Sequence, residues 1–136
     1  MVKTANAMTT WINLTMIAVG GAAGSVMRYL LTLAAAAVPG GSGALGTTCC
    51  NLIGCAAIGA FSQYTLSSES LSESTQLAVR VGILGGLTTF STFALESLLL
   101  SENGRWGSSA LYVSANLLLG WLAVFLTMSL VRSWTP

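Results

Sequence analysis

Hydroxyl and aromatic side chains alternate in one short stretch of an otherwise apolar segment. Residues 85–96 read Gly-Gly-Leu-Thr-Thr-Phe-Ser-Thr-Phe-Ala-Leu-Glu. Hydroxyls and unpaired backbone at membrane depth are tolerated only where they are buried in protein or line a polar path. The glycine pair also weakens a helix, by about 1 kcal/mol per glycine relative to alanine. The stretch therefore predicts a broken membrane helix that handles an ion.

The two rings of this stretch, Phe90 and Phe93, are three residues apart and so lie on one face of a helix. An aromatic ring is positive at its edge, so two edges can attract an anion without a permanent charge that would trap it. The neighbouring hydroxyls of Ser91 and Thr92 can add hydrogen bonds that replace hydration. Plain packing against lipid or core is the alternative for the two rings, and spacing alone would favour it.

Two further segments carry neutral hydrogen-bonding groups at helical spacing. Thr47 and Asn51 are four residues apart, and Tyr112, Asn116 and Gly120 recur every four residues. A buried asparagine amide in lipid must find hydrogen-bond partners, because leaving it unpaired costs several kcal/mol. The Asn51 amide either joins two helices or donates to a ligand, and both alternatives stay open.

Composition places these groups in a membrane protein. The 136 residues are 54% hydrophobic and only 7% charged, whereas soluble domains are about one quarter charged. The net charge of +1 provides no basic field for nucleic acid, and the sequence has no histidine to serve as a general base or metal ligand. The three cysteines fall in one apolar segment, and we expect them to pack rather than to bind metal or form a disulfide.

Long uncharged stretches predict four membrane-spanning helices. Residues 4–27, 29–68, 81–95 and 106–131 contain no charged side chain, and about 20 apolar residues suffice to cross the hydrocarbon. We expect an all-α integral membrane protein of one domain, with helices at about residues 11–38, 45–64, 75–100 and 108–131. The third would be broken near Gly85 to Thr88. A polar connection is expected at residues 67–76.

Small residues at four-residue spacing predict close helix packing. Gly20 and Gly24 form one such pair, and Gly46, Cys50 and Gly54 form a second stripe. Tryptophans at positions 11, 106 and 134 lie near the predicted helix ends, where interfacial aromatics belong.

The charges specify orientation weakly. Four spans would put Lys3, Arg80 and Arg132 on one side and Arg28 with Arg105 on the other. Arg28 itself either extends to the interface or pairs with backbone carbonyls inside the protein. With three cations against two, the chain could insert both ways and pair with an inverted copy.

Taken together, these motifs resemble the Fluc/CrcB family of bacterial fluoride channels over nearly the whole chain. The resemblance is carried by residues 20–29 (Gly-Gly-Ala-Ala-Gly-Ser-Val-Met-Arg-Tyr), 46–54 (Gly-Thr-Thr-Cys-Cys-Asn-Leu-Ile-Gly) and 85–96. It implies an antiparallel, dual-topology homodimer with two fluoride pores, and a structural sodium ion at the dimer centre. The backbone carbonyls of Gly85 and Thr88 would hold that ion from both subunits.

The resemblance also implies pore residues. Phe90 and Phe93 match the two phenylalanines that face fluoride, and Asn51 matches the asparagine that lines the pore. Further matches are Thr47, Tyr112, Arg28 and Glu96, the last with an open role, and Ser91, Thr92 and Asn116 are added as candidate donors. Two positions depart from the family: Gly120 stands where relatives often carry a polar residue, and Thr48 replaces a usual aliphatic.

The resulting expectation is a channel and not an enzyme, for passive fluoride efflux across the bacterial cytoplasmic (inner) membrane. The expected partners are fluoride, a second copy of the chain and the lipid bilayer, with no nucleic acid. The alternative is a dual-topology, proton-coupled exporter of the small multidrug type. Such exporters need a membrane-embedded glutamate in the first helix, and the first helix here has no acid.

Overall fold

Four long helical segments form the part of the chain that the computed structural model describes, residues 7–67 and 71–134. The first two are continuous: α1 (Ala7–Ala37) and α2 (Gly43–Ser67). The third comprises α3 (Glu73–Leu77), the π-helix η1 (Ala78–Ile83), α4 (Leu84–Leu87) and α5 (Phe90–Glu102). The fourth comprises α6 (Trp106–Ser114), the π-helix η2 (Ala115–Leu119) and α7 (Gly120–Trp134). All four segments are long and apolar enough to cross a membrane.

The observed segments overlap the four ranges expected from the sequence, and each begins a few residues earlier. The expected polar connection includes residues 68–70, which lie outside the described residues, as does Lys3 of the charge balance. Tryptophans 11, 106 and 134 are all exposed close to helix ends, as interfacial aromatics should be.

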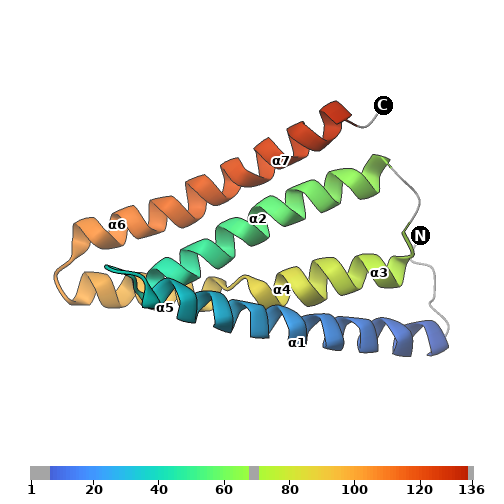
Figure 1. Ribbon diagram of the computed structural model, residues 1–136, viewed down its shortest axis with the longest axis horizontal. Helices are drawn as coiled ribbons and strands as arrows, with labels where there is room; N and C mark the ends of the chain where they lie inside the picture. The colour runs from blue at the N-terminus through green and yellow to red at the C-terminus, as the bar shows by residue number, and fades with distance from the viewer. Residues whose placement is uncertain (1–6, 68–70, 135–136) are drawn as a thin grey trace.

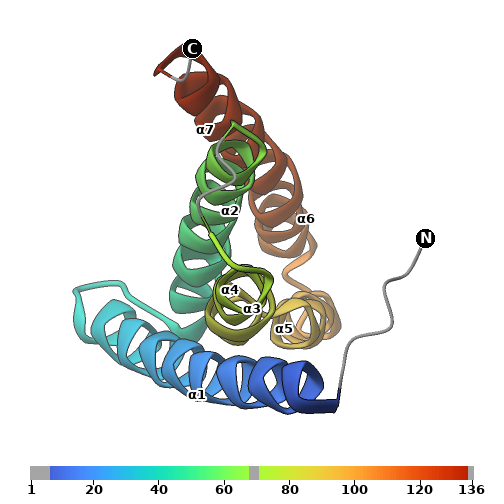
Figure 2. The same ribbon diagram turned by 90° about the vertical axis from the view of Figure 1, so that its right-hand side faces the viewer.

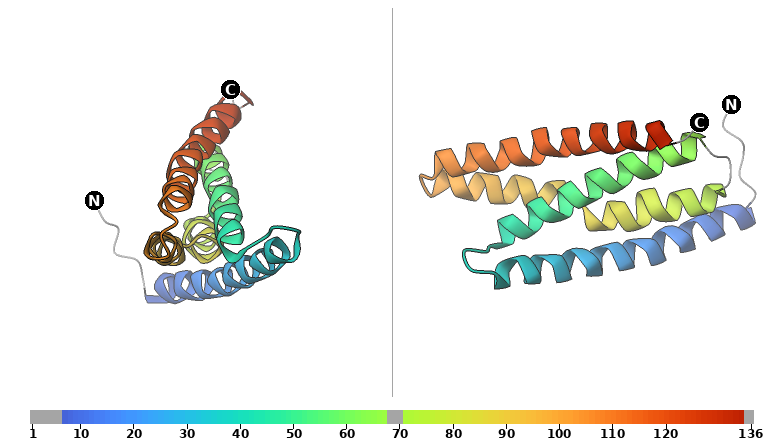
Figure 3. Two further views of the ribbon diagram at one scale, coloured as in Figure 1. Left: turned by 90° about the vertical axis from the view of Figure 1, so that its left-hand side faces the viewer. Right: turned by 45° about the horizontal axis from the view of Figure 1, so that its top comes forward.

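Successive segments run in opposite directions. The start of α1 and the end of α7 therefore lie at the same end of the bundle (Figure 1). Seen end on, α3, α4 and α5 lie between α1 on one side and α2 with α6 and α7 on the other (Figure 2). The main contacts join α1 to η1, α2 and α4, α2 to α7, and α5 to α6 (Figure 3). Smaller contacts join α2 to α4 and α5. The third segment thus contacts the other three.

Glycines bring α1 and the third segment into backbone contact. A Cβ on Gly20 would lie 2.6 Å from the carbonyl oxygen of Ala78, and one on Gly82 would lie 2.9 Å from that of Ile17. A Cβ on Gly24 would collide with the carbonyl of Ile83. The prediction of a packing face at Gly20 and Gly24 is confirmed.

The second predicted stripe is also confirmed as a packing face. Gly46 and Gly54 are buried, and a Cβ on Gly46 would press against Thr32 of α1. Cys50 is fully buried in a small core with Leu84 and Leu87 of α4. Leu87 of this core is the last residue of α4, immediately before the break in the third segment.

The break itself lies at Thr88 and Thr89, at the C-terminal end of the predicted range Gly85 to Thr88. Both residues are extended, with φ −83° and ψ 155° at Thr88 and φ −150° and ψ 114° at Thr89. Gly85 and Gly86 remain helical within α4. Gly86 serves packing instead, because a Cβ there would lie 2.6 Å from the carbonyl oxygen of Gly21. The extended backbone falls on the β-branched threonines, which favour that conformation.

Candidate functional site

Two threonines terminate one helix and begin the next. The Thr88 hydroxyl donates to the carbonyl oxygen of Leu84 at 2.9 Å and closes α4. Thr89 is the N-cap of α5, where its hydroxyl oxygen accepts from the backbone N–H of Thr92 at 3.2 Å. The same Thr89 hydroxyl donates to the Thr92 hydroxyl at 3.0 Å. The break is therefore a specific turn, held by its own side chains.

Three aromatic rings meet at the start of α5. Phe93 is only 5% exposed, and its ring centroid lies 5.4 Å from that of Phe90 in an edge-on arrangement with an interplanar angle of 62°. On its other side it lies 5.5 Å from the Tyr112 ring, tilted by 49°. Phe90 is 73% exposed on the single chain. One ring is thus locked among its neighbours, and the other projects outward.

The Asn51 side chain of α2 ties that helix to the break. Its Oδ1 accepts from the Thr89 N–H at 2.8 Å, and its Nδ2 donates to the Thr89 carbonyl oxygen at 3.2 Å. In a continuous helix the Thr89 N–H would have bonded to the carbonyl of Gly85. Asn51 Oδ1 therefore takes the place of the carbonyl oxygen that would bond to the Thr89 N–H in a helix. Of the two alternatives for this amide, the structure shows the one in which it joins two helices.

A second amide continues the network into the fourth segment. Asn51 Nδ2 also donates to Asn116 Oδ1 at 2.9 Å. Asn116 Nδ2 donates to the hydroxyl oxygen of Thr48 at 3.1 Å and to the carbonyl oxygen of Tyr112 at 3.0 Å. Asn116 lies in the π-turn η2, and such turns are frequent at functional sites.

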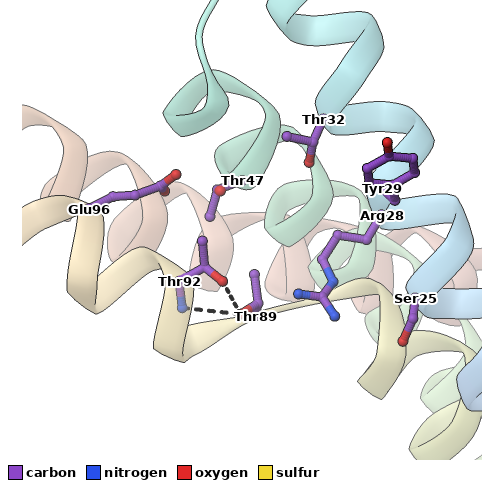
Figure 4. Close-up of a pocket in the computed structure, with 8 residues that line it drawn as sticks. All are labelled: Ser25, Arg28, Tyr29, Thr32, Thr47, Thr89, Thr92 and Glu96. Atoms are coloured by element: carbon purple, nitrogen blue, oxygen red, sulfur yellow. Dashed lines mark hydrogen bonds between the residues drawn. The ribbon is translucent and has the colours of Figure 1, made fainter.

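A cavity of about 320 Å³, lined by residues with polar or charged side chains, opens beside the break (Figure 4). Four predicted site residues line it, Arg28, Thr47, Thr92 and Glu96, together with Thr89, Ser25, Tyr29 and Thr32. Figure 4 shows Arg28 and Glu96 toward opposite ends, with threonine side chains between them. The cavity therefore offers hydroxyl donors between one cation and one acid.

Each of the two charged residues has a defined partner. Arg28 Nε donates to the carbonyl oxygen of Gly86 at 3.0 Å, so of its two alternatives the inward pairing with backbone is the one observed. Glu96 Oε2 accepts from the Tyr112 hydroxyl at 2.6 Å. This short, charge-assisted bond joins α5 to α6 next to the buried Phe93 ring.

The predicted residues gather in two adjoining places. Asn51, Asn116, Tyr112, Phe93 and Thr92 belong to the connected network of bonds and rings, and Thr47 is buried at the cavity wall. Ser91 is exposed, with its hydroxyl 3.4 Å from that of Thr89. Gly85 and Thr88 line a separate cavity of about 250 Å³ that also reaches Asn51. Gly120 packs instead, since a Cβ there would lie 3.3 Å from the sulfur of Cys55.

Sequence reasoning missed two members of the network. In the sequence, Thr89 stood out only as one of several neighbouring hydroxyl residues. A threonine at the start of a helix is nevertheless a recognisable N-cap, because its side chain can accept from the backbone N–H three residues later, here that of Thr92. Thr48 had no assigned role, because its partner Asn116 is distant in sequence. The sequence alone could not pair the Thr48 hydroxyl with Asn116, because that pairing depends on how the two helices pack against each other.

This arrangement suits ions and offers two kinds of ligand. Ring edges, hydroxyls and amide N–H groups favour an anion, whereas carbonyl oxygens released at a helix end favour a hard cation. The carbonyl of Gly86 already pairs with Arg28, and that of Gly85 loses its usual donor to Asn51. The two kinds of ligand lie on opposite sides of the Thr88–Thr89 link.

Comparison with known proteins gives a consistent family. Residues 15–128 match the family described as CrcB-like protein, Camphor Resistance (CrcB). A Rhodopirellula baltica protein named fluoride-specific ion channel FluC is 37% identical over 145 residues, covering 94% of this chain and 99% of that protein. A protein of the same name from Shewanella sp. strain ANA-3 is 41% identical over 122 residues, covering 89% and 97%. One from Agrobacterium fabrum is 37% identical over 122 residues, covering 90% and 98%.

The chain therefore belongs to the CrcB/FluC family of fluoride channels, as the resemblance predicted. That family is one of ion channels and not of enzymes. With its four apolar segments and bacterial relatives, the chain is a multi-pass membrane protein. The alternative of a small multidrug exporter loses its basis, since the chain belongs to a different family.

Proposed function

We propose that this chain forms a fluoride-selective channel for passive fluoride efflux across the bacterial cytoplasmic membrane. Fluoride crosses membranes as neutral HF in acid surroundings and is trapped as the anion inside. A selective leak driven by the membrane potential would expel it without covalent chemistry. The relatives named fluoride-specific ion channel, at 37% and 41% identity over most of the chain, support this function.

The observation that carries the proposal is the ring cluster at the start of α5. Phe93 is held edge to face against Phe90 and packed on Tyr112, so its ring cannot turn freely. Its edge would attract fluoride, while neutral donors replace part of the hydration shell. We assign the pore to Phe90, Phe93, Asn51, Thr47, Ser91, Thr92, Tyr112 and Asn116, with Arg28 and Glu96 setting the field near it.

Weak, distributed contacts of this kind suit conduction. An ion must bind well enough to enter and weakly enough to leave. The only cation lining the described cavity beside the break, Arg28, is already paired with a carbonyl oxygen. The ring edges and neutral donors of α5 would attract an anion without a fixed positive charge on α5 itself.

The working unit in this proposal is an antiparallel homodimer with a structural sodium ion at its centre. Gly85 and Phe90 are exposed on the single chain, although both belong to the proposed ion sites. A second, inverted copy would cover them and bring two sets of Gly85 and Thr88 carbonyls together. Diversion of the Thr89 N–H to Asn51 makes the Gly85 carbonyl a suitable ligand for sodium.

Fluoride efflux from liposomes reconstituted with purified protein tests the function. We expect rapid fluoride release after the membrane potential is set, with chloride release near that of protein-free liposomes. Equal flux of the two anions would refute fluoride selectivity. Exchanging sodium for a large organic cation should lower the thermal stability of the dimer, and an unchanged midpoint would argue against the sodium site.

Accessibility labelling tests the inverted pairing. A single cysteine placed in the turn at the exposed Asn103, on a background without the three native cysteines, is labelled from one side of intact cells. Partial labelling that is completed after permeabilisation is expected if copies insert both ways. One fixed orientation in every copy would exclude the antiparallel dimer.

A further inference from the structure

Thr48 joins two helices at a position that the proposed pore does not yet use. It lies on α2, and its hydroxyl donates to the carbonyl oxygen of Ala44, one turn earlier, at 3.0 Å. That bond consumes the only hydroxyl hydrogen, so the oxygen can only accept from other groups. It accepts from Asn116 Nδ2 of the fourth segment at 3.1 Å.

This acceptor, together with the Tyr112 carbonyl oxygen, determines how the Asn116 amide is turned. The amide nitrogen carries two hydrogens, and its partners are the Thr48 hydroxyl oxygen and the Tyr112 carbonyl oxygen. With both acceptors on the nitrogen side, Oδ1 of Asn116 must face the other way. On that side, Asn116 Oδ1 accepts from Asn51 Nδ2 at 2.9 Å.

Asn51 is oriented in turn by that oxygen. Its Nδ2 donates to Asn116 Oδ1 and to the Thr89 carbonyl oxygen, while its Oδ1 accepts from the Thr89 N–H. If the Asn116 amide were reversed, its N–H groups would face those of Asn51. Two donors in contact repel, so the Asn51 amide would have to turn and release the backbone of Thr89.

We propose that Thr48 is a positioning residue of the pore, which fixes the Asn116 and Asn51 amides and thereby the extended backbone at Thr89. Thr89 begins α5, so its placement sets the direction in which the Phe90 and Phe93 rings enter the site. Both N–H groups of Asn51 are engaged within the protein. Fluoride reaches this amide only by displacing one of its two acceptors, and the longer bond, to the Thr89 carbonyl, is the one to yield.

The test compares three variants and uses a readout that does not depend on transport. Thr48→Val keeps the shape and removes the hydroxyl, and Thr48→Ser keeps the hydroxyl and removes the methyl. The matched control is Thr15→Val on α1, because Thr15 makes the same bond to a carbonyl one turn earlier, at 2.9 Å, but is exposed. Hydrogen exchange at the Thr89 amide is followed by NMR in detergent micelles, and fluoride efflux is measured from liposomes.

We expect Thr89 amide exchange in Thr48→Val to accelerate about three- to tenfold, the effect of one lost hydrogen bond. Fluoride efflux should fall by a similar factor. Thr48→Ser and Thr15→Val should match the unmodified chain in both measurements. Unchanged Thr89 exchange in Thr48→Val, or an equal effect in Thr48→Ser, would overturn the positioning role.

The effect on flux rests on the proposed function, and the two can fail separately. If the unmodified chain releases no fluoride, the proposed function fails, while Thr89 exchange still decides whether Thr48 orients the amides. If the unmodified chain conducts and Thr48→Val accelerates exchange without slowing efflux, positioning of the pore is refuted and the channel function stands.

Discussion

Replacing Phe93 by isoleucine should stop fluoride flux while the dimer still assembles. Phe93 is 5% exposed and contacts two rings, at centroid distances of 5.4 Å and 5.5 Å. Each aromatic pair contributes about 0.5–1.5 kcal/mol beyond its buried area, so the stability cost is about 1–3 kcal/mol. Isoleucine preserves most of the bulk, which limits any cavity.

The effect on the ion should be larger than the effect on folding. A desolvated ion against the quadrupole of an aromatic ring gains about 2 kcal/mol or more, and the positive edge acts on an anion through the same quadrupole. Loss of 2 kcal/mol corresponds to about thirtyfold. We therefore expect fluoride efflux to fall at least about thirtyfold, close to that of protein-free liposomes.

The matched control is Phe125→Ile on α7. Phe125 stacks on Trp121 at 5.8 Å with an interplanar angle of 6°, and its ring is exposed away from the cluster. That variant also loses one aromatic pair, but its efflux should equal that of the unmodified chain. Full efflux from an intact Phe93→Ile dimer would remove this ring from the pore. An equal loss in Phe125→Ile would show that the assay reports folding alone.

Three further substitutions probe other parts of the site. Asn51→Asp should slow fluoride efflux, because its carboxylate repels an anion; faster efflux would contradict the pore assignment. Tyr112→Phe removes the 2.6 Å bond to Glu96 and should cost about 1.5–3 kcal/mol of stability. The loss should appear as a lower unfolding midpoint in detergent, and an unshifted midpoint would contradict a stabilising role for this bond. Gly24→Val should cost about 1–3 kcal/mol of stability, because the new side chain would overpack against η1. Gly21→Val, with open space at its Cβ, should leave stability unchanged, and equal unfolding midpoints for the two variants would disprove the close packing at Gly24.

Periodic features of the sequence predicted the bundle well. Uncharged apolar length decides which segments can span a membrane, so the four segments follow from composition alone. Small residues at four-residue spacing indicated where backbones touch, and Gly20, Gly24, Gly46 and Gly54 are all buried at helix contacts. These signals are local, because each depends only on residues of one helix.

The sequence predicted a break near Gly85 to Thr88 but could not assign it to the threonines rather than the glycines, because two local signals competed. Glycine weakens a helix, but it also lets a neighbouring helix approach, and at Gly86 the contact with α1 holds the helical backbone. Thr88 and Thr89 can cap a helix through their hydroxyls, and this chemistry decides where α4 ends. The outcome depends on what lies opposite each residue, which the sequence order does not contain.

Pairs across helices were the least predictable part of the site. Arg28 could extend to the interface or turn inward, and only the proximity of the Gly86 carbonyl decides between them. Thr48 and Asn116 are 68 positions apart, so their bond depends on how α2 and η2 face each other. A single polar residue on an apolar helix predicts a partner without naming it.

Two helix ends of opposite polarity meet at the Thr88–Thr89 link, and in the proposed channel their meeting would explain how one stretch could hold two kinds of ion. The helical run that ends at Leu87 presents carbonyl oxygens and a partial negative charge, whereas α5 begins with amide N–H groups and a partial positive charge. In the proposed channel, these partial charges would favour sodium on the side of Gly85 and fluoride on the side of Phe90 and Phe93. Asn51 satisfies both faces of the link, through one acceptor and one donor to Thr89. A carboxylate at position 51 could only accept from the Thr89 N–H, and an ammonium group could only donate to the Thr89 carbonyl oxygen. A neutral amide can do both, whether or not it also touches the ion.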